Sequence, residues 1–311
     1  IWGACVSGTR IVTSAPSESD AALTLVEDGT GARNLGIEAP ARPGIVAIGV
    51  SGVSLDAIVV AGARVAGLYL SGGSLTASDL VVRGTRERAS DGRDGRGLGV
   101  QDGAHLALSR ALLEDNREHG FFVDGAGTSV EATDVVVRGT RERASDGALG
   151  RGINVQDGAH LALSRALVED NREFGLYVAG LGTIVEAIDV VVRGTRERAS
   201  DDALGRGIDV EPGAHLALSR ALVEDNRDGG LFVDGTDTSV EATDFVVRGT
   251  RERASDGTFG RGVTVQDGAH LALSRALVED SRELGLFVYG TGTGVEATDV
   301  VVRGTRERAS D

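Results

Sequence analysis

The chain has 311 residues and a net charge of −15 at neutral pH, which disfavours a protein that coats nucleic acid. Cys5 is the single cysteine, so an internal disulfide and a zinc site made of several cysteines are excluded. No apolar run approaches the ~18 residues of a membrane-spanning helix. We therefore expect neither a nucleic-acid partner nor a membrane span.

Residues 1–43 do not fit the repeat that fills the rest of the chain. They combine a turn-rich start, one run of apolar alternation and three prolines. We predict an irregular first coil that caps the apolar core, followed by a repetitive domain over residues 44–311. Because the chain begins without Met and ends inside a repeated loop, we expect it to be a fragment of a longer protein.

The repetitive domain is built from units of 55 residues. The segment RGTRERASD begins at Arg83, Arg138, Arg193, Arg248 and Arg303. Each unit divides into two sub-repeats that open on a glycine, with spacings that alternate between 23 and 32 residues. These glycines are Gly97, Gly120, Gly152, Gly175, Gly207, Gly230, Gly262 and Gly285, with weaker copies at Gly44 and Gly67.

Apolar residues alternate with period two inside each sub-repeat, and helical periodicity is absent. Three short runs separated by turns predict three strands per coil. Equivalent strands recur in the same direction, so we expect three parallel sheets around a narrow core, in about ten coils and a rod roughly 50 Å long. Asn116, Asn171 and Asn226 are expected in a left-handed turn conformation, with Gly84, Gly139, Gly194 and Gly249 serving the alternate coils.

The sub-repeats GINVQDGAHLALSRALVEDN (152–171) and GLYVAGLGTIVEAIDVVVRGT (175–195) resemble the right-handed parallel β-helix repeat of the pectate-lyase-like superfamily. The resemblance covers about residues 44–311 and implies an all-β solenoid. Coils of 23 and 32 residues do not fit the hexapeptide rhythm of left-handed β-helices. The superfamily includes lyases, hydrolases, epimerases, phage tailspikes and surface proteins without catalysis, so the resemblance implies a secreted or surface location but no single function.

A catalytic site should occur once, whereas the charged residues here recur with the repeat. The histidines at 105, 160, 215 and 270 occupy the same turn position in four successive units. Neighbouring copies are expected about 9.6 Å apart, which is too far for two of them to bind one metal ion. His119 is the exception among the histidines. No aspartate-rich calcium loop and no phosphate-binding glycine loop is present. We therefore predict no catalytic residues, no metal and no cofactor.

One column of aromatic residues falls on the side that faces away from the core. It occupies the third position of a Gly-apolar-x-Val pattern, amid polar residues that vary between copies. Aromatic rings beside polar groups suit carbohydrate binding. The alternative is that the long loop folds over the rings and buries them. The predicted ligand-binding residues are Phe122, Tyr177, Phe232, Phe287, Asn154, Asp209, Asp234 and Tyr289.

The repeated loop is mildly basic, while the rest of each unit is acidic. Stacked loops therefore predict a basic ridge, formed by Arg138, Arg141, Arg143, Arg193, Arg196, Arg198, Arg248, Arg251 and Arg253. Such a ridge would meet an anionic polysaccharide or lipid headgroups. The alternative is that these arginines pair with acids within and between neighbouring loops, at ~0–1 kcal/mol per exposed pair.

Three functions remain open. The first is a non-catalytic structural or adhesive rod of a bacterial secreted or surface protein that binds polysaccharide or other cell-surface components. The second is a polysaccharide-active lyase or hydrolase, whose groove includes Phe122, Tyr177 and Phe232. The third is a module that self-associates through its open coil ends.

Overall fold

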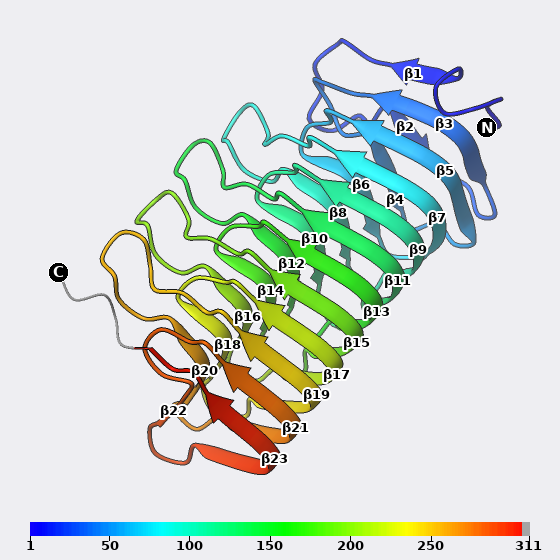
Figure 1. Ribbon diagram of the computed structural model, residues 1–311. Coiled ribbons are helices and arrows are strands. Elements are labelled where there is room, and N and C mark those ends of the chain that lie inside the picture. Colours follow the sequence, from blue (N-terminus) through cyan, green and yellow to red (C-terminus); the bar gives the residue numbers. More distant parts are fainter. Residues whose placement is uncertain (307–311) are drawn as a thin grey trace.

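The computed structural model describes residues 1–306, and the last five residues of the fifth RGTRERASD copy lie outside them. Within these residues the chain forms one rod of two parallel sheets, with twelve strands in sheet A and eleven in sheet B (Figure 1). No helix in this part of the chain is long and apolar enough to cross a membrane.

Sheet A contains the odd-numbered strands in sequence order. They are β1 (Arg10–Val12), β3 (Gly31–Glu38), β5 (Val53–Ala61), β7 (Ser74–Arg83), β9 (His105–Glu114), β11 (Ser129–Arg138), β13 (His160–Glu169), β15 (Ile184–Arg193), β17 (His215–Glu224), β19 (Ser239–Arg248), β21 (His270–Glu279) and β23 (Gly294–Arg303).

Sheet B contains the even-numbered strands. They are β2 (Leu23–Leu25), β4 (Ile45–Ile48), β6 (Ala66–Ser71), β8 (Arg96–Gln101), β10 (His119–Asp124), β12 (Arg151–Gln156), β14 (Phe174–Ala179), β16 (Arg206–Val210), β18 (Gly229–Asp234), β20 (Arg261–Gln266) and β22 (Leu286–Tyr289).

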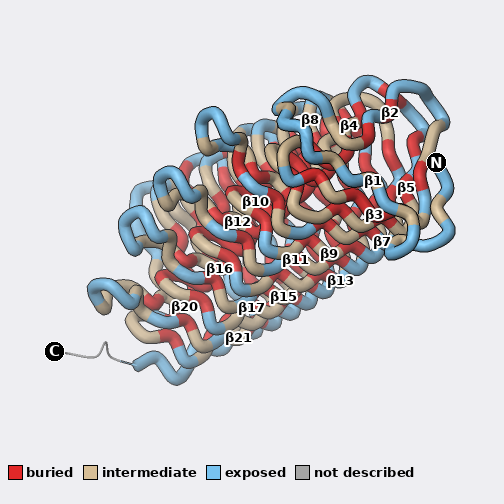
Figure 2. Tube along the Cα trace, turned by 90° about the horizontal axis from the view of Figure 1, so that it is seen from above, coloured by how far each residue is buried: buried red, intermediate tan, exposed pale blue. Residues whose placement is uncertain are grey.

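The chain visits the two sheets in turn, so each strand pairs in parallel with the strand one coil away. Leu176, for example, aligns with Ile153 on one side and Ile208 on the other. These inward residues are buried and stack into a continuous Leu, Val, Ile and Ala core (Figure 2). The all-β parallel β-helix predicted from the sequence is confirmed.

The prediction of three sheets is wrong, because the second and third apolar runs join into one strand of sheet A. A residue with left-handed backbone bends each of these strands, such as Asp134 (φ 57°) or Arg165 (φ 51°). The bend reverses the alternation: Val130 and Ala132 point inward before it, and Val135 and Val137 after it. Hydrogen-bonded pairing continues on both sides of the bend, so no third sheet separates.

The turn after sheet A is also built differently from the prediction. The left-handed residue is Asp170 (φ 53°) rather than the asparagine that follows it, whereas Gly194 has φ 67° as expected. The Asn171 side chain is fully buried instead. Its Oδ1 accepts a hydrogen bond from the Thr140 amide (2.9 Å), and its Nδ2 donates to the Val137 carbonyl (3.3 Å). Asn116 and Asn226 make the same contacts.

The glycine that opens each sub-repeat is needed because the core is narrow at that point. A Cβ added to Gly175 would lie 2.4 Å from Cγ1 of Val192 and 2.6 Å from the Gly207 carbonyl oxygen. Both distances are far below van der Waals contact, so a side chain there would push the coils apart.

Residues 1–43 contribute β1, β2 and β3, which pair with the first strands of both sheets. The first four RGTRERASD segments form long loops that project from the rod and lie beside one another (Figures 1 and 2). A glutamate of each loop ties it to the next: Glu87 accepts a hydrogen bond from the Ala144 amide, and Glu142 from the Ala199 amide. The loops therefore form a wall along the start of the sheet B strands.

Candidate functional site

The outer face of sheet B carries one column of side chains that point away from the core. An aromatic residue occupies every second strand, and a small or polar residue lies between each pair. Strand register aligns all of them, so the predicted aromatic residues do share one face. In order, the column is Tyr69, Gly99, Phe122, Asn154, Tyr177, Asp209, Phe232, Thr264 and Phe287.

Four of the five rings are covered by an arginine that ends the long loop before them. The guanidinium carbon lies 3.5–4.3 Å from the ring centroid in the pairs Arg96–Phe122, Arg151–Tyr177, Arg206–Phe232 and Arg261–Phe287. Such a contact stabilises by ~0.5–2 kcal/mol. Phe122, Asn154 and Asp209 are buried, and the other three rings are half-buried. The column is therefore less open than the sequence suggests.

The covering arginines are also neutralised by acids of the rod itself. Arg151 donates to Glu173 (2.7 Å) and to Asn154 (2.9 Å). Arg206 pairs with Asp209 (2.7 Å) and Asp228 (2.9 Å). This face therefore offers aromatic edges and hydrogen-bonding groups rather than free positive charge.

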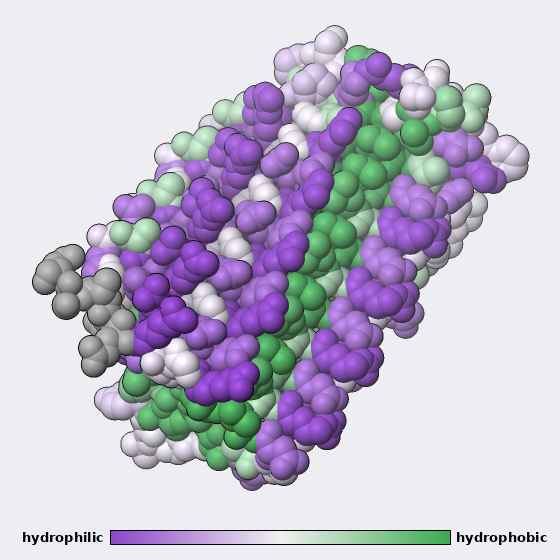
Figure 3. All heavy atoms as spheres, in the orientation of Figure 1, coloured by the Kyte–Doolittle hydropathy of each residue, from purple (hydrophilic) through white to green (hydrophobic). Residues whose placement is uncertain are grey.

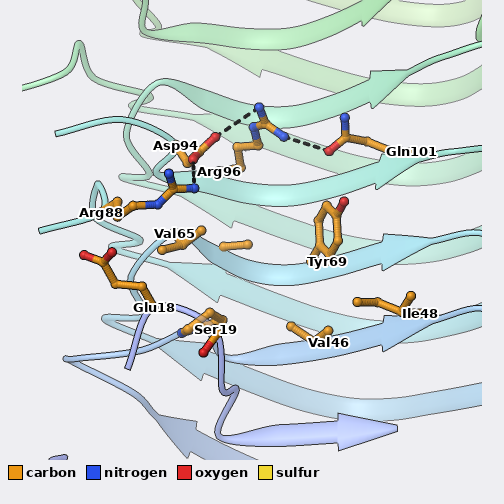
Figure 4. A pocket seen from close by; sticks show the side chains of 12 residues that line it. Glu18, Ser19, Val46, Ile48, Val65, Tyr69, Arg88, Asp94, Arg96 and Gln101 are labelled. Carbon is orange, nitrogen blue, oxygen red and sulfur yellow. Dashed lines mark hydrogen bonds and ion pairs between the residues drawn. The ribbon is translucent and has the colours of Figure 1, made fainter. Parts of the chain in front are cut away.

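Tyr69 differs from the other four rings, because no arginine among residues 1–306 lies over its ring. The strand register places Pro43 where Arg96 stands in the next short coil. Proline carries no guanidinium group, so Pro43 cannot cover Tyr69 as Arg151 covers Tyr177. The Tyr69 ring instead faces a pocket of about 270 Å³ (Figure 4).

This pocket, which we call the Tyr69 pocket, has an apolar floor and polar walls. Val46, Ile48 and Tyr69 lie along the floor, and Arg96 donates to Gln101 (2.8 Å) at one side (Figure 4). A shaped apolar surface with a few directed polar groups is the usual form of a small-ligand site. The lining residues are Glu18, Ser19, Pro43, Val46, Ile48, Val65, Ala66, Tyr69, Arg88, Asp94, Arg96 and Gln101.

Two segments distant in sequence form the walls of the Tyr69 pocket. Glu18, in the N-terminal segment, accepts hydrogen bonds from the amide (2.9 Å) and hydroxyl (2.8 Å) of Ser90 in the first long loop. Within that loop Arg88 pairs with Asp94, which also contacts Arg96 at 3.1 Å. The walls are thus fixed by ion pairs that leave little net charge.

A second column runs beside the aromatic one and consists mainly of amides and carboxylates. Gln101 and Gln156 both donate to Asp124, at 2.7 and 3.1 Å. Gln266 donates to Asp234 at 3.0 Å. Tyr289, at the end of this column, is 64% exposed and stacks on Phe287 at 6.2 Å. These groups can bind hydroxyls in series along the rod.

The third repeat carries two carboxyl groups, at residues 209 and 211, where the second repeat carries two side-chain amides. Asn154 donates to Gln156 (2.9 Å) in the second repeat, and Asp209 and Glu211 take their places in the third. Burial together with the nearby Asp209 charge raises the pKa of Glu211 to about 7. Burial also raises the pKa of Asp209, and Arg206 opposes that rise. The sequence analysis missed Glu211, although glutamine holds this place in the other copies.

His119 is buried against the outer face of sheet B, unlike the other histidines. Its ring packs 4.9 Å from Phe122, and burial lowers its pKa well below the ordinary value. The repeated turn histidines are solvent-accessible, and His105 and His215 each contact a serine hydroxyl, Ser129 and Ser239. Among residues 1–306, no group of three or more His, Cys, Asp or Glu side chains is placed to hold a metal.

The arginines of the predicted basic ridge are largely paired with acids. Arg193 contacts Glu169 (2.7 Å) and Arg248 contacts Glu224 (2.6 Å), while Arg138 pairs with Glu114. Arg196 is exposed. Most of the ridge arginines are therefore paired, but within residues 1–306 only Arg143–Asp146 and Arg198–Asp201 pair within a loop, and the others pair with acids of the adjacent coil. The remaining pairs are Arg141–Asp115, Arg143–Asp146, Arg198–Asp201, Arg251–Asp225 and Arg253–Asp228.

No protein-family model matches this chain, and no curated protein matches its sequence. The fold is that of solved parallel β-helices. The A-module of mannuronan C-5 epimerase AlgE4 from Azotobacter vinelandii aligns with a TM-score of 0.55 and 12% identity, over 100% of this chain and 83% of that one. The tailspike gp42 of Acinetobacter phage vb_AbaP_AS12 aligns with a TM-score of 0.55 and 9% identity, over 91% of this chain and 58% of that one.

A third structure, a double mutant of the periplasmic alginate epimerase AlgG, gives a TM-score of 0.52 and 9% identity, over 90% of this chain and 74% of that one. The chain thus spans little more than half of the tailspike and most of the two epimerases. At these identities the likeness establishes the fold alone, which is a right-handed parallel β-helix.

Proposed function

We propose that this chain is a non-catalytic rod of a secreted or surface protein that binds polysaccharide along the outer face of sheet B. The observation that carries the proposal is the Tyr69 pocket. Tyr69 offers a ring free of guanidinium cover above an apolar floor, with amide and carboxylate groups beside it. A sugar ring can stack on the tyrosine while its hydroxyls bind Gln101 and Arg96.

Two further considerations support the proposal. The polar column continues from Gln101 along the rod, so a chain of sugars leaving the pocket meets similar groups at each coil. The two epimerases with the same fold also offer precedents, since mannuronan and alginate are polysaccharides. The periplasmic enzyme favours a location outside the cytoplasm.

The ion pairs of this face favour a neutral glycan over a strongly acidic one. Arg151 and Arg206 are committed to carboxylates, and the whole chain carries a charge of −15. An array of neutral and acidic glycans tests the function directly. Binding by at least one extended glycan is the expected result, and the absence of any binding would overturn the proposal.

A polysaccharide-cleaving activity is the second candidate, and it is favoured by the Asp209–Glu211 pair. A carboxyl group that keeps its proton near neutral pH can act as a general acid toward a glycosidic oxygen. Release of new chain ends from a bound glycan, lost in Glu211→Gln, would support this candidate over the non-catalytic one. End-to-end association through the open coil ends stays a prediction.

A further inference from the structure

An unbroken column of apolar side chains runs along the outside of sheet A. One valine or leucine of each strand from β5 to β23 points outward just after the bend, and strand register aligns them. None of them belongs to the buried core. We call this column the apolar stripe: Val59, Val81, Leu112, Val136, Leu167, Val191, Leu222, Val246, Leu277 and Val301.

Figure 3 shows this feature as a continuous hydrophobic band along the rod, between two hydrophilic rows. Monomeric soluble proteins seldom expose an apolar band of this extent, and such bands mark surfaces that bind another protein. The band is straight and repeats with the coil rise, so a partner with the same repeat would match it along its whole length.

Two rows of charged residues border the apolar stripe. On one side are the bend residues, which pair along the rod as Arg165–Asp134 (2.7 Å) and Arg220–Asp189 (2.6 Å). On the other side are the residues that end each strand, such as Glu169, which pairs with Arg193 (2.7 Å). The sign alternates from strand to strand within each row.

The two rows also have opposite signs on every strand from β7 to β23. Strand β13 carries Arg165 on one side of Leu167 and Glu169 on the other, and β15 carries Asp189 and Arg193 on the two sides of Val191. The remaining strands are β7 (Asp79, Arg83), β9 (Arg110, Glu114), β11 (Asp134, Arg138), β17 (Arg220, Glu224), β19 (Asp244, Arg248), β21 (Arg275, Glu279) and β23 (Asp299, Arg303).

We propose that two copies of this chain pair side by side through the apolar stripe, with the rods parallel and in register. A twofold axis along the rods sets the bend row of one copy against the strand-end row of the other. Each coil then places Arg165 against the partner's Glu169, or Asp189 against the partner's Arg193. In an antiparallel pair the bend row would instead face the partner's bend row, and like charges would meet in every second register, as when Asp79 faces the partner's Asp299.

The stripe is large enough for a weak, specific interface. The nine spacings of ~4.8 Å between ten strands and the four spacings of ~3.3 Å across five residues give about 570 Å² per copy and about 1,100 Å² buried in total. Stable interfaces begin near 1,000 Å². The pairing is therefore expected at micromolar concentrations or above, and it differs from association through the coil ends.

Sedimentation equilibrium of the full chain tests the pairing. We expect a monomer–dimer equilibrium that Val191→Lys weakens at least tenfold. Ile188→Lys is the matched control, because Ile188 lies on the same strand, is 43% exposed and is outside the stripe. Circular dichroism checks that both variants fold. A monomer up to 200 µM, or equal weakening by the two variants, would overturn the proposal.

Spin labels test the orientation. Thr76 on β7 and Glu296 on β23 are exposed in the same outward column of sheet A. Each is replaced singly by cysteine in a Cys5→Ser background, and the label–label distance is measured by pulsed electron paramagnetic resonance. In an equimolar mixture of the two variants, the parallel pair keeps the Thr76 label of one copy far from the Glu296 label of the other, because eight strand spacings separate β7 from β23. A short distance between these two labels, as in an antiparallel pair, would overturn the proposed arrangement.

Discussion

Asp209 and Glu211 bring two carboxyl groups together at the place where Asn154 donates to Gln156 one unit earlier. Burial and the Asp209 charge raise the pKa of Glu211 to about 7, so Glu211 holds its proton below this pH. Arg206 contacts Asp209 at 2.7 Å and opposes the rise that burial causes in the pKa of Asp209. The Asn154–Gln156 pair thus shows the same arrangement on the outer face of sheet B without titratable carboxyl groups.

The first prediction concerns the pH dependence of stability. The pKa of Glu211 is raised from 4.5 to about 7 in the folded protein. Between these values only the unfolded chain releases the proton, so the free energy of unfolding falls as pH rises through this window and is flat above it. Allowing for the partial exposure of Glu211, we expect a fall of roughly 1–2 kcal/mol.

Urea unfolding at pH 5 and pH 7.5 measures this difference. Glu211→Gln should remove the part of the fall that Glu211 contributes, since a glutamine amide donates to Asp209 at both pH values. The double variant Asp209→Asn with Glu211→Gln reproduces the pair found in the second repeat and serves as the folded control. Identical pH profiles for the wild-type protein and Glu211→Gln would contradict the raised pKa of Glu211.

The second prediction compares the stability lost on removing an arginine that covers an aromatic ring with that lost on removing an arginine of the basic ridge. Arg151→Ala uncovers Tyr177 and removes the closest partner of Glu173, whose side chain is 1% exposed. Arg198 stays 3.6 Å from Glu173, so we expect a loss of roughly 2–3 kcal/mol, below the ~3–5 kcal/mol of a buried charge left with no partner. Arg138→Ala breaks a pair in which the arginine is 45% exposed, and should cost less than ~1 kcal/mol. Equal losses in urea unfolding would show that the outer-face arginines have no special structural role.

The third prediction concerns the turn after sheet A. Asn171→Ala removes two buried hydrogen bonds and leaves the Thr140 amide and the Val137 carbonyl unpaired, at ~2–3 kcal/mol. Asp170→Gly should be nearly neutral in calorimetry, because Asp170 already has a left-handed backbone (φ 53°). If Asp170→Gly destabilises as much as Asn171→Ala, the assignment of roles in this turn is wrong.

Much of the fold follows from the sequence because its pattern is local. Alternation around Val155 and Leu161 identifies strands, and the fixed unit length sets the register that aligns Leu176 with Ile153. The third sheet was predicted wrongly because Asp134 and Arg165 change the phase of alternation without breaking the hydrogen-bonded ladder. A change of phase and a new strand look alike in a sequence.

The candidate site is only partly predictable from the sequence. The outward position of Tyr69 and Tyr177 follows from period two, but their exposure depends on residues one coil away. Arg151 covers Tyr177, whereas Pro43 leaves Tyr69 open, and neither contact is visible without the strand register. The aromatic column therefore could be located from the sequence, but the pocket could not.

We propose that the uncovered Tyr69 ring stacks against a sugar ring of the bound glycan. Pro43→Arg tests it most directly, because it supplies the arginine that covers the equivalent rings and leaves Tyr69 itself unchanged. Isothermal titration with a glycan selected from the array should show at least tenfold weaker binding for Pro43→Arg, and likewise for Tyr69→Ala. Tyr177→Ala, at a ring already covered, should change the affinity much less. Unchanged affinity in Pro43→Arg and Tyr69→Ala would contradict the claim.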